Sequence, residues 1–180
     1  MKAAVVYESM YGNTRRIARA IAEGLGAGAE TKVVSAEEAG QMDPGGLDLL
    51  VVGGPTHAHG MVRVQTRNAA VKDVRSRDKG LIVDPSAGGP GLREWFDSLG
   101  SGSGLAAAFY TRVDAPELLT GHAAKGIGKR LQKHGFDLVV EPESFLVSGD
   151  SALRPGELGR ARGWGQMLAA TLRDEQQPST

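Results

Sequence analysis

The chain has 180 residues, 41% hydrophobic and 23% charged, which fits one globular domain with room for an insertion and excludes a large multidomain enzyme or a disordered chain. Twenty-one basic residues balance 21 acidic ones, so no net field draws the chain to nucleic acid or to an anionic membrane. Cysteine is absent, which removes disulfides, thiolate nucleophiles and iron–sulfur ligation, and a redox role would need a bound cofactor.

Five apolar segments rich in β-branched residues recur along the chain. They lie at 3–7, 31–35, 47–53, 105–110 and 136–140. Most are continuously apolar, which is typical of strands covered on both faces, as in the parallel sheets of α/β proteins. Pro142 interrupts the last segment because proline cannot donate to a strand ladder. Residues 144–147 are expected to continue that strand on the sheet edge.

Helical patterns lie between these segments. Ile17, Ile21 and Leu25 recur at four-residue spacing, with arginines on the opposite side, which predicts an amphipathic helix after the first strand. Further helices are expected over 91–99, 123–134 and 157–172. Both tryptophans are expected in the core between helices and sheet.

The alternation predicts a single domain over residues 1–173, followed by a flexible tail at 174–180. Residues 61–89 form a long connection, since most strand-to-helix loops have about 2–6 residues. We expect this insertion to hold a helix around 69–77 and to serve as a lid or docking surface. The run GSGSG at 100–104 predicts a flexible turn before the fourth strand.

The segment Ser9-Met10-Tyr11-Gly12-Asn13-Thr14 lies directly between the first strand and the first helix. A phosphate dianion needs several N–H donors, and the first-turn amides of a helix supply them. The hydroxyls of Ser9 and Thr14 can add donors, while Gly12 lets the backbone approach closely. The simpler interpretation is that Asn13 or Thr14 only caps the helix. The Walker A and G-x-G-x-x-G patterns are missing from this loop, so triphosphate and first-strand NAD sites are not expected.

The string VVYESMYGNTRRIA resembles the phosphate loop of the flavodoxin family, (S/T)-x-(T/Y)-G-x-T, which wraps the phosphate of FMN. The resemblance implies a three-layer, doubly wound α/β fold with a five-stranded parallel sheet in the order 2-1-3-4-5. FMN would lie at the switch point between the first and third strands. The phosphate contacts implied by the resemblance are Ser9, Met10, Tyr11, Gly12, Asn13 and Thr14.

The loop after the third strand reads GGPTHAHGM over residues 53–61. In flavodoxins this loop borders one face of the isoalloxazine ring, and the string also resembles the GSPT loop of flavin-dependent quinone reductases. The ring contacts implied by the resemblance are Pro55, Thr56, His57, Ala58, His59 and Gly60. The two histidines could instead be a metal pair, but no neighbouring Asp, Glu or Cys completes a shell, so no metal is expected. A plain exposed loop is the remaining alternative.

The loop after the fourth strand holds Tyr110, Thr111, Arg112 and Asp114. In the family this loop passes the pyrimidine edge of the ring and commonly offers a stacking tyrosine, so the resemblance implies contacts from Thr111, Arg112 and Asp114. This chain departs from the pattern, because Tyr110 can equally belong to the strand core. Arg112 can approach N1 and O2 of the ring or pair with Asp114 on the surface.

These features predict an FMN-binding electron-transfer protein that carries electrons between a reductase and a redox acceptor. An NAD(P)H-dependent FMN quinone reductase and a flavin-free binding module are the alternatives. No Ser/His/Asp order or G-x-S-x-G elbow supports hydrolase chemistry. Residues 63–79 carry an excess of four positive charges, which is a solvated helix face or a docking patch for an acidic redox partner or the phosphates of NAD(P)H.

The N-terminal apolar run is short, and nowhere do 18 apolar residues follow one another. We therefore expect a cytoplasmic protein without membrane or nucleic-acid partners, either a monomer or a weak homo-oligomer. A neutral chain repels a reduced flavin less than the strongly acidic flavodoxins do. The second reduction step should accordingly have a less negative potential than in those proteins.

Overall fold

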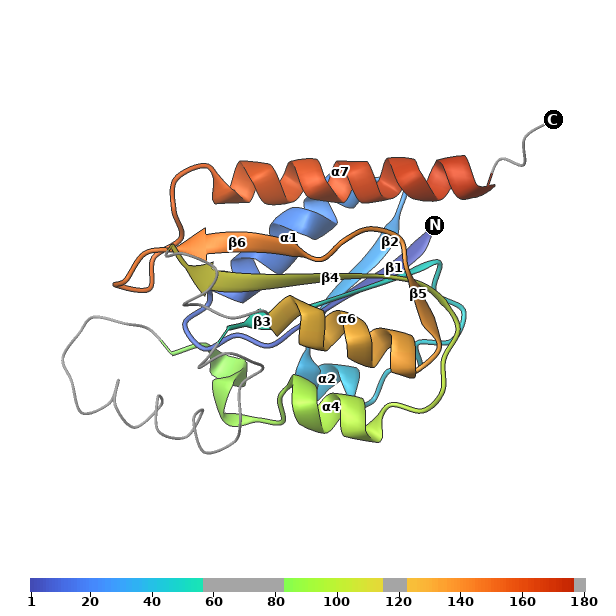
Figure 1. Cartoon of the computed structure of the whole chain (residues 1–180), viewed down its shortest axis with the longest axis horizontal. Helices are drawn as coiled ribbons and strands as arrows, with labels where there is room; N and C mark the ends of the chain where they lie inside the picture. The colour runs from blue at the N-terminus through green and yellow to red at the C-terminus, as the bar shows by residue number, and fades with distance from the viewer. Residues whose placement is uncertain (57–82, 115–122, 177–180) are drawn as a thin grey trace.

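The computed structural model describes residues 1–56, 83–114 and 123–176. Strands and helices alternate along the chain, as the apolar pattern predicted (Figure 1). The elements are β1 (Lys2–Tyr7), α1 (Asn13–Leu25), β2 (Glu30–Ser35), α2 (Ala36–Ala39), β3 (Leu49–Pro55), the 3-10 helix η1 (Pro85–Gly88), α4 (Leu92–Ser98), β4 (Gly104–Val113), α6 (Ala123–Lys133), β5 (Phe136–Leu138), β6 (Glu143–Val147) and α7 (Glu157–Gln176).

The strands form one parallel sheet in the order β2-β1-β3-β4-β5, which confirms the predicted order. β6 also pairs with β4 in parallel. β5 lies beside the start of β4 at Gly104–Ala106, and β6 lies beside its end at Phe109–Val113. The two short strands therefore share one edge position, and the predicted continuation past Pro142 is confirmed.

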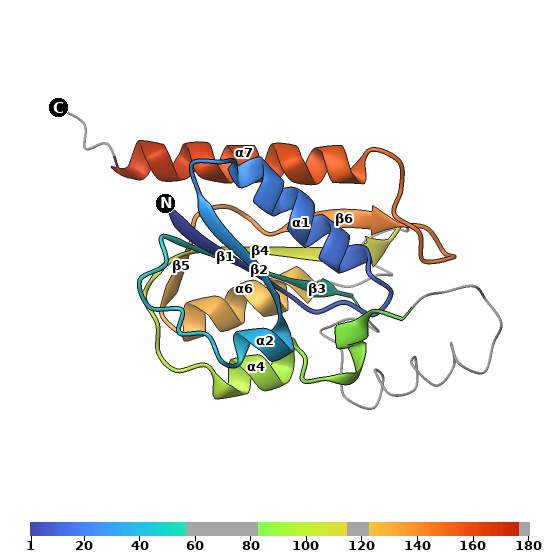
Figure 2. The same ribbon diagram turned by 180° about the vertical axis from the view of Figure 1, so that it is seen from behind.

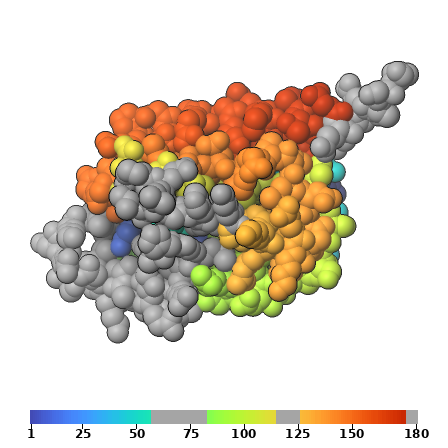
Figure 3. All heavy atoms as spheres, in the orientation of Figure 1, coloured from blue at the N-terminus to red at the C-terminus, as the bar shows by residue number. Residues whose placement is uncertain are grey.

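Helices cover both faces of the sheet, so the molecule has three layers (Figures 1 and 2). Successive strand residues enter opposite cores: Leu49 and Val51 pack with α1 and α7, whereas Leu50 and Val52 pack with α2, α4 and α6. This alternation explains why the strands are continuously apolar. Figure 3 shows the same separation at the surface, with α7 along one border and α6 with α4 along the other.

Helices α1 and α7 touch through two glycines. A Cβ atom on Gly24 would collide with the carbonyl of Arg162, and one on Gly165 would collide with the carbonyl of Ile21. The two backbones can approach this closely only because neither residue has a side chain. The contact fixes α7 over the sheet, together with the turn that leads into it.

Both tryptophans are buried, which confirms their predicted place in the core. The short elements α2 and η1 were not predicted, although a Ser35–Glu38 capping box, a recognisable sequence signal, starts α2. Helix α7 runs to Gln176, three residues into the predicted tail. The predicted helix at 69–77 lies outside the described residues. None of the described helices is both long and apolar enough to cross a membrane.

Candidate functional site

The carboxyl ends of β1, β3, β4 and β6 meet at one edge of the sheet and border a pocket of about 90 Å³. Ligands of doubly wound folds bind at this edge, where the strand order reverses between β1 and β3. The pocket is lined by Ser9, Met10, Tyr11, Asn13, Thr14, Pro55, Thr56, Thr111, Arg112, Val113, Val147 and Ser151. Three loops that the sequence assigned to one ligand are thus brought together by the fold.

The loop from β1 to α1 presents backbone donors to this pocket. Gly12 precedes the helix with φ of 81°, a left-handed conformation that favours glycine. No side chain caps the start of α1, and the first helical hydrogen bond runs from the Arg16 N–H to the Gly12 carbonyl at 3.0 Å. The N–H groups of the first turn therefore have no partner inside the helix and can bind an anion.

Two buried hydroxyls of the pocket lack a hydrogen-bond partner among the described residues. They are Ser9 Oγ on the β1–α1 loop and Thr56 Oγ1 just after β3. Ser9 is only 1% exposed. Buried polar atoms are rarely left without partners in folded proteins. Two such hydroxyls lining one pocket fit an oxygen-rich ligand.

A third polar contact joins the first and third loops of the site. Thr14 Oγ1 lies 2.9 Å from Thr111 Oγ1, and both residues are buried. Two hydroxyls that share one hydrogen bond use one of their two protons. The accepting hydroxyl keeps its own proton, so one of the two threonines can donate to a ligand oxygen. Thr14, the residue that the sequence predicted for this role, can do so when Thr111 donates to it.

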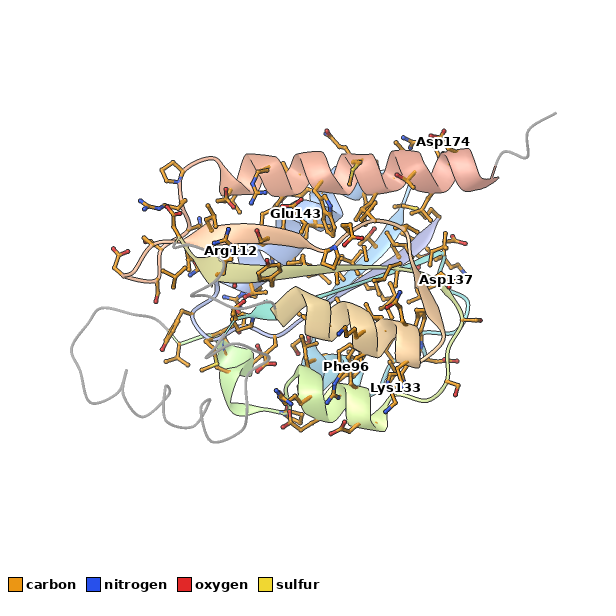
Figure 4. The ribbon with its side chains drawn as sticks, viewed as in Figure 1. Phe96, Arg112, Lys133, Asp137, Glu143 and Asp174 are labelled. Atoms are coloured by element: carbon orange, nitrogen blue, oxygen red, sulfur yellow. The ribbon has the colours of Figure 1, made fainter. Side chains whose placement is uncertain are left out.

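Arg112 lies at the end of the sheet where β4 and β6 terminate, opposite the end that holds Asp137 (Figure 4). It borders the pocket, and among the described lining residues it is the one with a positively charged side chain. Asp114 forms an ion pair with Arg154 at 2.9 Å, where the sequence suggested Arg112 as partner. Asp114 is not among the lining residues. The structure thus separates these two residues, which the sequence analysis had grouped.

Tyr110 is buried inside β4 at 5% exposure, so the alternative in which it belongs to the strand core is correct. Gly53 and Gly54 also belong to a strand, since β3 extends to Pro55. A Cβ atom at Gly53 would collide with the ring of Phe109, so this glycine serves packing. His57, Ala58, His59 and Gly60 lie outside the described residues.

Behind the loop lies Asp84, a buried residue that the sequence did not reveal as part of the site. Asp84 donates its N–H to the Met10 carbonyl at 2.8 Å, and its side chain accepts from the Ser86 N–H and pairs with Arg15 at 3.3 Å. Burial raises the pKa of the Tyr7 phenol above its ordinary value, and the negative charge of Asp84 adds to this increase. Asp84 lies in the predicted insertion, and no local pattern linked it to the loop.

Asn13 and Ser151 form a further contact that the sequence did not reveal. The side-chain amide of Asn13 donates to the carbonyl of Ser151 at 2.6 Å, across 138 positions of the chain. Among the described part of the chain, groups of three or more His, Asp or Glu that could hold a metal ion are absent. The polar chemistry of the pocket is therefore that of N–H groups, hydroxyls and one guanidinium.

The fold and this pocket define a doubly wound domain with a donor-lined anion site at its switch point. The family model described as Flavodoxin matches residues 5–89, which include the whole 9–14 loop. This match to the N-terminal part of the chain, together with the flavodoxin-like order of the sheet, supports a relationship to the flavodoxin family. No curated protein sequence matches the chain.

Solved structures show the same fold at low sequence identity. A flavodoxin from the domain Archaea is 18% identical with a TM-score of 0.58, covering 96% of this chain and 99% of its own. Oxidised flavodoxin 1 from Bacillus cereus is 17% identical with a TM-score of 0.60, covering 97% and 98%. A WrbA-like flavodoxin from Agrobacterium tumefaciens is 19% identical with a TM-score of 0.58, covering 96% and 98%. These structures share their fold with nearly the whole chain.

Proposed function

We propose that this protein binds one FMN non-covalently and carries electrons between a reductase and a redox acceptor protein. The observation that supports this best is the pair of partnerless buried hydroxyls, Ser9 and Thr56, beside the uncapped start of α1. Flavodoxins as a family typically bind FMN, and residues 9–14 of this chain resemble their phosphate loop. Bound FMN would supply the redox chemistry, while the protein supplies binding, orientation and electrostatic tuning.

The described residues fit a phosphate monoester. The pocket is smaller than the roughly 300–1,000 Å³ typical of drug-sized ligands, and at about 90 Å³ it has room for the phosphate end rather than the ring. The Ser9, Thr14 and Thr56 hydroxyls would bind the phosphate oxygens together with the first-turn N–H groups of α1. This gives Thr56 a different role from the ring contact that the resemblance implied. The isoalloxazine would lie against the 57–60 loop and the end of β4.

Charge around the pocket suits a dianion. Arg112 borders it directly, whereas Arg15 is engaged with the buried carboxylate of Asp84. Asp114 is neutralised by Arg154. The carboxylates of Asp84 and Asp114 are thus paired with arginines, which lowers their repulsion of a phosphate or a reduced ring.

An absorbance spectrum of the purified protein tests the proposal. The protein is incubated with FMN, passed through gel filtration, and then treated with NADPH without oxygen. Retained flavin bands that persist with NADPH support a carrier that needs a separate reductase. Failure to retain flavin at excess FMN would contradict the proposal and favour a flavin-free binding module.

The second candidate is an NAD(P)H-dependent FMN quinone reductase. It is favoured by the burial of Tyr110 in β4, since this residue then offers no stacking ring to the flavin. An open flavin face would admit a nicotinamide or a quinone. Rapid loss of flavin colour on addition of NADPH, with turnover of a quinone, would select this alternative.

We propose a cytoplasmic, single-domain protein in either case.

A further inference from the structure

The turn between β6 and α7 has a backbone feature that points to function. Ser151 has φ of 64° and is the non-glycine residue with positive φ in the described part of the chain. An L-residue holds this conformation only where its surroundings enforce it, and such positions cluster at binding sites. Ser151 also borders the pocket. Its conformation is therefore tied to the shape of the proposed FMN site.

A set of local hydrogen bonds enforces the turn. The Ser151 N–H donates to the Ser148 carbonyl at 3.0 Å, and the Ser148 N–H donates to the Ala152 carbonyl at 2.8 Å. The Ser148 hydroxyl receives the Ala152 N–H at 3.2 Å and also bonds the Asp150 carboxylate. Ser148 does not border the pocket, so its hydroxyl supports the turn from outside the site.

Asn13 connects this turn to the phosphate loop. It is the first residue of α1, and its amide nitrogen lies 2.6 Å from the Ser151 carbonyl oxygen. Ser151 has its left-handed conformation where its carbonyl accepts the hydrogen bond from the Asn13 side-chain amide. An amide committed to a protein carbonyl is less free to bind the phosphate, which was the role that the sequence suggested for Asn13.

We propose that Asn13 and Ser151 form a clip in which Asn13 positions the phosphate loop and the β6–α7 turn closes the pocket against it. The inference rests on the proposed FMN function. A loop held in its binding conformation before the ligand arrives loses less conformational freedom on binding. Asn13 would thus raise phosphate affinity through its backbone N–H and its hold on the turn.

A double-mutant cycle tests the clip, because Ser148 acts on it without touching the ligand. Dissociation constants of FMN and riboflavin are measured by flavin fluorescence for wild type, Asn13→Ala, Ser148→Ala and the double variant. We expect Asn13→Ala to weaken FMN binding by about 3–10-fold, the usual value of one hydrogen bond, and to leave riboflavin binding unchanged. Ser148→Ala should weaken FMN binding less, and the double variant should match Asn13→Ala.

Thr171→Ala is the matched control, since it removes a hydroxyl-to-carbonyl hydrogen bond on α7 away from the pocket. It should leave both dissociation constants unchanged. Additive losses in the double variant, equal losses for FMN and riboflavin, or no loss in Asn13→Ala would each overturn the clip. Wild-type protein that does not bind FMN would overturn the proposed function as well, which distinguishes the two failures. Thermal unfolding of each apo variant verifies that it is folded.

Discussion

Two polar regions at the same end of the sheet are built in opposite ways. Where β6 meets α7, Arg160 bonds Glu157 and Glu143 at 2.7 Å each, and its guanidinium lies 4.7 Å from the centre of the Phe145 ring. In the phosphate pocket, Ser9 and Thr56 keep buried hydroxyls that lack partners among the described residues. The first region satisfies its polar groups and the second does not.

The difference distinguishes polar groups that stabilise the fold from polar groups that are available to a ligand. Polar groups that pair with each other stabilise the fold, whereas leaving a buried polar group unpaired costs about 1–3 kcal/mol. A chain that carries that cost next to uncapped helix N–H groups is prepared for a ligand. Substitutions in the two regions should therefore have opposite profiles.

The largest effect is expected at Gly12. Gly12→Val places a β-branched residue at φ of 81°, and even an ordinary L-residue costs about 1–2 kcal/mol there. The loop should leave its binding conformation, and FMN affinity should fall about tenfold or more, as isothermal titration would measure. Gly28→Ala is the control, because its Cβ meets no atom within 4 Å. Unchanged FMN affinity in Gly12→Val would show that the loop does not bind the phosphate.

Glu157→Gln should lower the free energy of unfolding by about 2 kcal/mol, because the charged partner of Arg160 and of the Leu146 N–H is lost. FMN affinity should stay near that of wild type. Urea unfolding of the apo-protein measures the first effect, and a flavin titration measures the second. A variant with wild-type stability and weakened FMN binding would reverse the proposed division of roles.

The same carboxylate gives the protein a pH dependence. Burial alone would raise the pKa of Glu157, but hydrogen bonds from Arg160 and Leu146 outweigh it and hold the pKa below the ordinary 4.5. Its contribution is complete above the unfolded pKa and is lost as pH falls through the lower folded value. The stability difference between wild type and Glu157→Gln should accordingly shrink as the medium becomes acidic. A difference that grew in acid would contradict this sign.

Ser9→Ala and Thr56→Val should have the opposite profile. Each should weaken FMN binding by about 1.5 kcal/mol, roughly tenfold, since each removes a hydrogen bond to a charged ligand. Apo-protein stability should be unchanged or slightly higher, because the deleted hydroxyl has no described partner. Titration and thermal unfolding of the same samples provide both values. Substantial destabilisation of the apo-protein would mean that these hydroxyls are structural.

The smallest effect concerns Arg112. Arg112→Met removes the cation that borders the pocket, and a unit charge about 12 Å away contributes roughly 0.3 kcal/mol in a water-like medium. The potential of the second reduction step should become slightly more negative, and less so at high salt. A spectroelectrochemical titration at two salt concentrations measures this. A shift toward less negative potential would exclude a stabilising role for Arg112.

Local pattern was enough to predict the sheet and the position of the 9–14 loop at the start of a helix. Continuous apolar strands such as 49–52 require helices on both faces, and the 9–14 loop combines hydroxyls and glycine where a helix begins. The end of β4 was harder, because a strand residue and a loop residue have the same local signature. The sequence therefore allowed two positions for Tyr110, in the strand core or against the ring. The structure buries it in β4.

Contacts between distant segments could not be predicted from one sequence. Asn13 meets Ser151 across 138 positions, and Asp84 reaches the Met10 carbonyl from within the predicted insertion. Each depends on where the sheet places two loops, not on either loop alone. The residues that complete the pocket, Val147 and Ser151, follow from the pairing of β6 with β4.

The most direct test of the central claim compares FMN with riboflavin, which differ only by the phosphate. Both are titrated into the apo-protein, and binding is followed by quenching of flavin fluorescence. FMN should bind much more tightly than riboflavin, and Ser9→Ala should narrow the difference between the two affinities. Equal affinities for the two flavins, or no binding of FMN, would contradict a phosphate site at the start of α1.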